Sequence, residues 1–117
     1  MKTTFAPTFT ATIYVGRREG YNGPLIPRGA VLEVISAYCN EAKLCVTVTD
    51  TLFLYLNGAE PGFAIGLINY PRFPASQEEI KIKALALAHK LLEACNQYRV
   101  SVVFPDETET ILLDREG

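Results

Sequence analysis

The segment from Ser76 to about Gln97 constrains the fold most, because it begins with a helix-start signal and contains neither glycine nor proline. Ser76 and Glu79 form the capping-box pattern, in which each side chain bonds the backbone N–H of the other residue. The further apolar residues Ile82, Leu85, Leu92 and Cys95 make its apolar surface wider than one sheet face needs, so a second covered surface, such as a subunit interface, is expected. The stripe predicted to face the core is Ile80, Ala84, Leu87, Leu91 and Ala94.

Strands are predicted near both ends of the chain. Residues 8–16 and 98–104 are rich in β-branched and aromatic types, and a last strand is expected at 109–113. Between residues 27 and 42, apolar residues recur at spacings of three and four, which predicts a second amphipathic helix beginning at Pro27.

The middle of the chain predicts three further strands. Residues 44–49 alternate at period two, and Asp50-Thr51 can turn the chain into 52–56, so a hairpin is expected, although a single bent strand also fits. Residues 63–68 are apolar on both faces, which favours an inner strand covered on both sides. The order β-α-β-β-β-α-β-β predicts a two-layer α+β fold, with both helices on one face of a mostly antiparallel sheet.

Composition narrows the class of protein. The 117 residues suit a single domain, with 49% hydrophobic and 21% charged residues. The net charge of −2 argues against non-specific nucleic-acid binding. The sequence has no apolar run near the roughly 18 residues of a membrane span and no signal-peptide core at its N-terminus, so a cytoplasmic protein without a membrane partner is expected.

Catalytic motifs are scarce. Cys39, Cys45 and Cys95 form no CxxC pair and are expected to be buried small hydrophobic residues. His89 stands alone in the middle of the long helix, and the sequence contains no GxSxG, HExxH, P-loop or GxGxxG. The sequence therefore predicts a protein that is not an enzyme and needs no cofactor.

One acidic turn suggests an alternative function, in which the protein binds a metal ion. Asp106, Glu107 and Glu109 could hold a metal ion, although acidic turns between strands are usually just solvated. A metal-dependent hydrolase of a cyclic nucleotide is therefore an alternative function. A non-catalytic protein-interaction module, built on the wide apolar helix, is another.

The stretch before the long helix concentrates groups that can bind a ligand. Two prolines stiffen it, which lowers the entropy cost of holding Asn69, Tyr70, Arg72 and Phe73 in place. The structural explanation is a connection in which Phe73 fills part of the core. The functional explanation is one side of a binding site, where the aromatic rings stack on a flat ring of the ligand and the arginine neutralises an anion.

Arginines near strand ends extend this pattern. Arg18 follows the first predicted strand and Arg99 begins a later one, and a bidentate guanidinium suits a phosphate. Aromatic rings suit a base, and a carboxylate such as Asp106 suits ribose hydroxyls. These groups together predict a nucleotide pocket. The candidate ligand-binding residues are Arg18, Asn69, Tyr70, Arg72, Phe73, Arg99 and Asp106.

Several segments point to a known family, namely 11–16, 18–21, 44–49, 60–62, 66–74 and 97–100. They resemble Thoeris anti-defence protein one, a family of small phage and prophage proteins. The resemblance covers the chain from about Thr10 to Thr108. It implies a phage protein that binds glycocyclic ADP-ribose, a cyclic ADP-ribose isomer made by a bacterial TIR-domain immune enzyme, and sequesters it without cleavage.

The resemblance also implies roles for some residues. Arg99 in its Tyr-Arg-Val motif and Arg18 in its Val-Gly-x-Arg-Glu-Gly-Tyr motif would contact phosphates, while Tyr70 and Phe73 would stack on a base. The family implies homo-oligomers, acting in the cytoplasm of the infected host. This chain departs from the family at residues 25–29, where the family is more acidic and variable.

Overall fold

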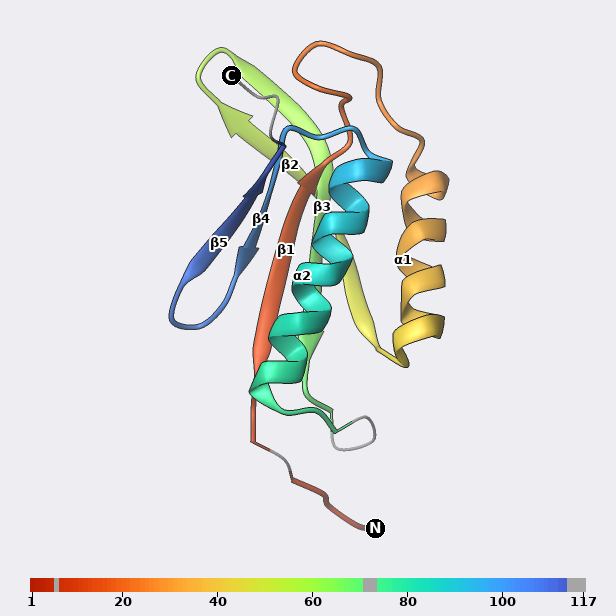
Figure 1. Ribbon diagram of the computed structural model, residues 1–117, viewed down its shortest axis with the longest axis vertical. Helices are drawn as coiled ribbons and strands as arrows, with labels where there is room; N and C mark the ends of the chain where they lie inside the picture. The colour runs from red at the N-terminus through yellow and green to blue at the C-terminus, as the bar shows by residue number, and fades with distance from the viewer. Residues whose placement is uncertain (6, 71–73, 114–117) are drawn as a thin grey trace.

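A computed structural model describes residues 1–5, 7–70 and 74–113 as five strands and two helices (Figure 1). The strands form one antiparallel sheet in the order β2-β3-β1-β4-β5, and both helices lie on the same face of it. The predicted two-layer α+β class is confirmed. The elements are β1 (Thr10–Gly16), α1 (Arg28–Ala42), β2 (Val46–Tyr55), β3 (Gly58–Ile68), α2 (Gln77–Ala94), β4 (Arg99–Val103) and β5 (Thr108–Leu112).

The core lies between α2 and the inner strands. Ile13 of β1 pairs with Ile65 of β3 and Val102 of β4, and all three side chains are fully buried toward the helices. Burying each such side chain stabilises the fold by about 1.5–3 kcal/mol. The stripe residues of α2 that meet them and are buried are Ile80, Ala84, Leu87 and Leu91.

The predicted capping box starts α2. The Ser76 Oγ accepts a hydrogen bond from the Glu79 N–H at 3.1 Å, and the Ser76 N–H donates to the Glu79 carboxylate at 3.3 Å. Of the extra apolar residues of α2, Leu92 is 5% exposed and Leu85 is partly buried, whereas Ile82 is 57% exposed. The neighbouring helix α1 therefore accounts for part of the wide stripe, while Ile82 stays exposed.

The predicted turn at Asp50-Thr51 is wrong. β2 is one continuous strand that pairs with β3 from Val46 opposite Leu67 to Tyr55 opposite Gly58. Asp50 lies within the strand opposite Phe63, and its carboxylate accepts two hydrogen bonds from the Arg28 guanidinium, at 2.9 and 3.0 Å. The turn falls instead at Asn57-Gly58, where the backbone of Asn57 has φ 60°.

β3 is an inner strand, but only one of its faces is covered by helices. Its other face carries the small residues Gly62, Ala64 and Gly66, and in the described part of the chain no helix lies on that side (Figure 1). The expectation of cover on both sides is therefore wrong. No helix among the described residues is long and apolar enough to span a membrane.

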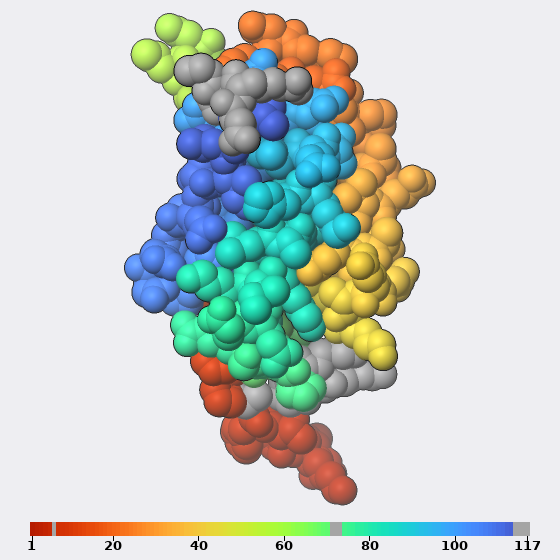
Figure 2. All heavy atoms as spheres, in the orientation of Figure 1, coloured from red at the N-terminus to blue at the C-terminus, as the bar shows by residue number. Residues whose placement is uncertain are grey.

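The β2–β3 hairpin is longer than the helices that cover the sheet. Its tip projects beyond them at the upper left of Figure 1 and stands out from the body in the space-filling view (Figure 2). This projection leaves one side of the hairpin free to border a cleft.

The capping box predicts a measurable cost for Ser76→Ala. The substitution leaves helix N–H groups unpaired and should lower the free energy of unfolding by about 1 kcal/mol. Urea denaturation followed by circular dichroism measures this. Ser36→Ala, on the exposed side of α1, is the matched control and should cost much less; an equal loss in both variants would contradict the role of the cap.

Candidate small-molecule cleft

A broad cleft of about 1000 Å³ opens where β1 ends beside the β2–β3 hairpin. Its size is within the range of small-molecule sites. We call it the tyrosine cleft, because aromatic rings make up much of its wall. The rings that line it are Tyr14, Tyr21, Phe53, Tyr55 and Tyr98.

The rings pack in pairs from separate parts of the chain. Tyr21 and Tyr98 have centroids 4.7 Å apart with planes at 39°, and Tyr14 and Phe53 meet edge to face at 6.3 Å. Gly20 has φ 55°, and a Cβ there would lie 3.1 Å from the Tyr98 ring, so glycine allows both the turn and the close approach. Such aromatic surfaces can stack on a flat heterocycle.

A carboxylate is held at the floor of the tyrosine cleft. The Glu60 carboxylate accepts a hydrogen bond from the Arg18 N–H at 2.9 Å. It lies directly over Gly16, where a Cβ would overlap it. The cleft therefore has a fixed position for a negative charge that faces the ligand space.

The two arginines predicted to contact phosphate line the same cleft. Arg18 donates from Nη1 to the Gly23 carbonyl at 3.2 Å, and its own carbonyl accepts from the buried Gln97 at 2.6 Å. Arg99 donates from Nη2 to the Tyr21 hydroxyl at 3.2 Å. The fold thus brings together positive groups that are far apart in the sequence, beside the carboxylate of Glu60.

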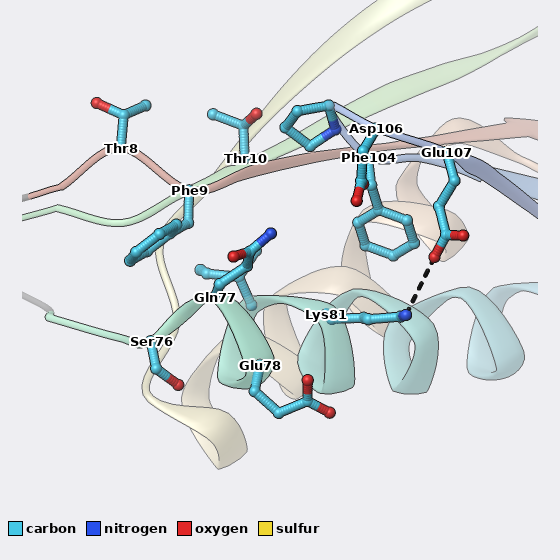
Figure 3. A pocket seen from close by; sticks show the side chains of 12 residues that line it. Thr8, Phe9, Thr10, Ser76, Gln77, Glu78, Lys81, Phe104, Asp106 and Glu107 are labelled. Carbon is cyan, nitrogen blue, oxygen red and sulfur yellow. Dashed lines mark hydrogen bonds and ion pairs between the residues drawn. The ribbon is translucent and has the colours of Figure 1, made fainter.

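Asp106 lines a different hollow of about 570 Å³, between the start of α2 and the β4–β5 turn (Figure 3). Lys81 reaches across it to Glu107, with 3.1 Å between Nζ and the carboxylate. This hydrogen bond raises the pKa of the Lys81 ammonium group. In residues 1–5, 7–70 and 74–113, no three His, Cys, Asp or Glu side chains form a metal-binding group.

The remaining candidates lie apart from the tyrosine cleft. Asn69 is buried, and its amide donates to the Pro7 carbonyl at 2.8 Å and accepts from the Ala75 N–H, which joins the N-terminal segment to the start of α2. Tyr70 lines a separate hollow of about 310 Å³. Arg72 and Phe73 lie outside the described residues.

Glu60 is not among the candidate site residues predicted from the sequence, although residues 60–62 belong to the segments that carry the family resemblance. The signal lies in the alternation of β3, where Gly58, Gly62 and Gly66 share one face with Glu60. A face so rich in glycine indicates close approach of other groups. At Gly62, the Phe53 ring is close enough to clash with an added Cβ.

The fold and the cleft define a class: a small two-layer α+β protein with an aromatic cleft at the end of its sheet. No protein-family model matches the sequence, and no match is found among functionally curated proteins. The fold does match a phage SAM lyase in complex with S-methyl-5′-thioadenosine, with 18% identity and a TM-score of 0.73 over 100% of this chain and 98% of that chain. A phage SAM lyase in the apo state gives 17% identity and a TM-score of 0.76 over 100% and 99%.

This comparison corrects one prediction. The absence of catalytic motifs predicted that the chain is not an enzyme, yet solved structures with this fold belong to a lyase. The inference from missing motifs is therefore wrong, because this fold also occurs in a protein named as an enzyme. At these identities the likeness concerns the fold, and the predicted relation to the Thoeris family stays a prediction.

The three cysteines differ in exposure, contrary to the expectation that all are buried. Cys45 is exposed, Cys39 is partly buried and Cys95 is fully buried. Burial raises the pKa of the Cys95 thiol to about 11. Because the thiolate is the reactive form, this residue should resist alkylation in the folded protein.

Alkylation at pH 8 therefore should modify Cys45 first and Cys95 only after unfolding. Mass spectrometry of peptides from iodoacetamide-treated protein, with and without urea, measures the order. Cys45→Ser should remove the fast-reacting site. Equal modification of Cys95 in the native protein would contradict its burial.

Gly16→Ala tests the position of the Glu60 carboxylate. The added methyl group overlaps only the end of a flexible side chain, so the fold should persist while the carboxylate moves away from the Arg18 N–H. The affinity for a small molecule bound in the tyrosine cleft should fall about tenfold, which corresponds to a loss of about 1.4 kcal/mol in binding free energy. Calorimetry measures it, with Gly29→Ala, where an added Cβ meets nothing, as the control that should bind normally.

Proposed function

We propose that the protein binds S-adenosyl-methionine in the tyrosine cleft and cleaves it as a lyase. The observation that carries the proposal is the fixed Glu60 carboxylate among aromatic rings, in a cleft that also contains Arg18 and Arg99. The likeness to a SAM lyase fold supports it.

The charges of the cleft complement those of this ligand. S-adenosyl-methionine carries a flat adenine, a positive sulfonium and ammonium, and a negative carboxylate. Tyr21 and Tyr98 provide a stacking surface for adenine, and Glu60 lies where it can attract the positive groups. Arg99 supplies a positive partner for the carboxylate.

The chemistry explains why general acids and bases are dispensable. S-methyl-5′-thioadenosine is what remains of S-adenosyl-methionine when the bond between sulfur and the methionine Cγ breaks. In a lyase the substrate's own carboxylate oxygen can attack Cγ, closing a lactone, while the electron pair of the Cγ–S bond leaves on sulfur. The leaving group is a neutral thioether and needs no proton.

Orientation is then the main task of the protein. A carboxylate beside the sulfonium stabilises the substrate more than the transition state, because the positive charge is lost in the reaction. Glu60 therefore binds and orients the cationic part of the substrate. Rate acceleration comes from a folded substrate conformation that places the carboxylate oxygen against Cγ.

Binding of a cyclic ADP-ribose isomer in the same cleft is a second candidate function. Two guanidinium groups in one cleft with aromatic rings favour it, because arginines suit a pyrophosphate and rings suit a base. Both candidates act on a nucleotide-derived small molecule, in agreement with the nucleotide pocket that the arginines and aromatic rings predicted.

Incubation with excess S-adenosyl-methionine tests the proposal. Chromatography with mass spectrometry should detect S-methyl-5′-thioadenosine and a four-carbon lactone, formed in amounts exceeding the protein. Glu60→Gln should lower kcat/KM by tenfold or more, as for loss of a charged hydrogen bond of about 1.5–3 kcal/mol. Glu33→Gln on the exposed side of α1 should behave as wild type.

The same samples separate the two candidates. If S-adenosyl-methionine persists and neither it nor S-methyl-5′-thioadenosine raises the melting temperature, the lyase proposal fails. A rise with glycocyclic ADP-ribose instead would favour the second candidate. Ligand at about 100 times its Kd should add about 2.7 kcal/mol to the stability of the folded state.

A further inference from the structure

The buried side chain of Gln97 reaches the tyrosine cleft from the connection between α2 and β4. The residue is 7% exposed and belongs to the lining of the cleft. Its Nε2 donates a hydrogen bond of 2.6 Å to the Arg18 carbonyl and a longer one of 3.4 Å to the Cys95 carbonyl. Because a buried amide without partners costs free energy, these bonds hold the Arg18 carbonyl against the segment that follows α2.

Arg18 is held through the peptide groups on both sides of its Cα. Its carbonyl accepts from Gln97, and its N–H donates to the Glu60 carboxylate at 2.9 Å. The two bonds join residues that are 79 and 42 positions apart in the sequence. A displacement of Arg18 moves the N–H donor that fixes Glu60, so the position of this carboxylate depends on the Gln97 amide.

Asn96 binds the same segment at another point. Its Nδ2 donates to the Glu19 carboxylate at 2.8 Å, and its carbonyl accepts from the Gly20 N–H at 2.8 Å. Asn96 is exposed, so water replaces its side-chain hydrogen bond at little cost. The Gln97 amide, in contrast, is buried and bonds directly to Arg18.

We propose that Gln97 is a positioning residue that gives the tyrosine cleft its preference for a positively charged ligand. It acts by holding the Arg18 backbone where the N–H fixes Glu60. The inference rests on the proposed function, in which S-adenosyl-methionine carries a sulfonium and an ammonium, whereas the product S-methyl-5′-thioadenosine is neutral. A fixed carboxylate attracts the charged substrate and not the neutral product, so the same arrangement favours release of the product.

Calorimetry with two small molecules tests the preference. Sinefungin resembles S-adenosyl-methionine but carries a protonated amine in place of the sulfonium, and S-methyl-5′-thioadenosine is the neutral comparison. Gln97→Met has nearly the same length and no donor, so it should weaken sinefungin binding about tenfold and leave S-methyl-5′-thioadenosine binding nearly unchanged. Asn96→Gly is the control and should keep both affinities, because glycine suits the backbone φ of 48° at this position.

A double substitution distinguishes positioning from a general structural role. Glu60→Gln removes the charge that Gln97 positions. In that background Gln97→Met should weaken sinefungin binding much less than in the wild type, because the two residues act through one chain of contacts. An equal loss in both backgrounds would overturn the proposal.

Hydrogen exchange of the Arg18 amide tests the backbone position without ligand. NMR should show faster exchange of this amide in Gln97→Met than in the wild type, while amides inside β1 and β3 keep their rates. Gln97→Glu, which also lacks the donor, should behave alike and replaces Gln97→Met if that variant fails to fold.

Two results would contradict the role of Gln97: an unchanged exchange rate of the Arg18 amide, or a wild type without preference for sinefungin. The lyase reaction is judged separately by turnover. If S-adenosyl-methionine persists while the preference for sinefungin and its dependence on Gln97 are observed, the lyase proposal fails and the positioning role stands.

Discussion

The packing of α2 on the inner strands holds the rest of this structure in place. Ile80, Leu87 and Leu91 are buried against a sheet whose central strand, β1, pairs with β3 on one side and β4 on the other. Because α1 packs mainly on α2, one layer of helices covers one face of the sheet. This leaves the opposite face, and the far part of the hairpin, for contact with other molecules.

The tyrosine cleft lies at the end of β1, and most of the strand residues that line it belong to the face of the sheet without helices. The β1 strand stops at Gly16, the hairpin continues past it, and the segment after α2 brings Tyr98 alongside Tyr21. Glycine at 16 and 62 lets the Glu60 carboxylate and the Phe53 ring approach the backbone closely. A charge fixed by a backbone N–H costs little reorganisation when a ligand binds, which is the advantage of a preorganised site.

The absence of catalytic motifs has a physical explanation in the proposed reaction. Proton donors and acceptors are needed when a leaving group must be protonated or a nucleophile deprotonated. A sulfonium substrate supplies a neutral leaving group and its own nucleophile, so a protein on this fold can work by binding and orientation. A sequence without motifs for acid–base catalysis is therefore compatible with an enzyme whose reaction needs no proton transfer.

The accuracy of the predictions follows from the range of the interactions involved. Ser76 and Glu79 cap α2 as expected, since the residues of a capping box are three positions apart. Asp50 was misassigned to a turn because its partner, Arg28, is 22 positions away. The site residues divide in the same way. Arg18 and Arg99 were identified by residue type, but Glu60 gained significance only when the strand register placed it beside Arg18, 42 positions away.

The sequence by itself determined the two helices, most of the strands and the two-layer class, because periodicity and local caps are read from neighbouring residues. Tertiary structure alone decided that the stretch at Asn69 and Tyr70 lies apart from the arginines, with the Asn69 amide bonded to Pro7 and Ala75. It also decided that Leu85 and Leu92 of α2 are partly or fully buried, whereas Ile82 and the leucines of the hairpin are exposed. Burial and the gathering of charges depend on which distant segments meet, and no local pattern contains that information.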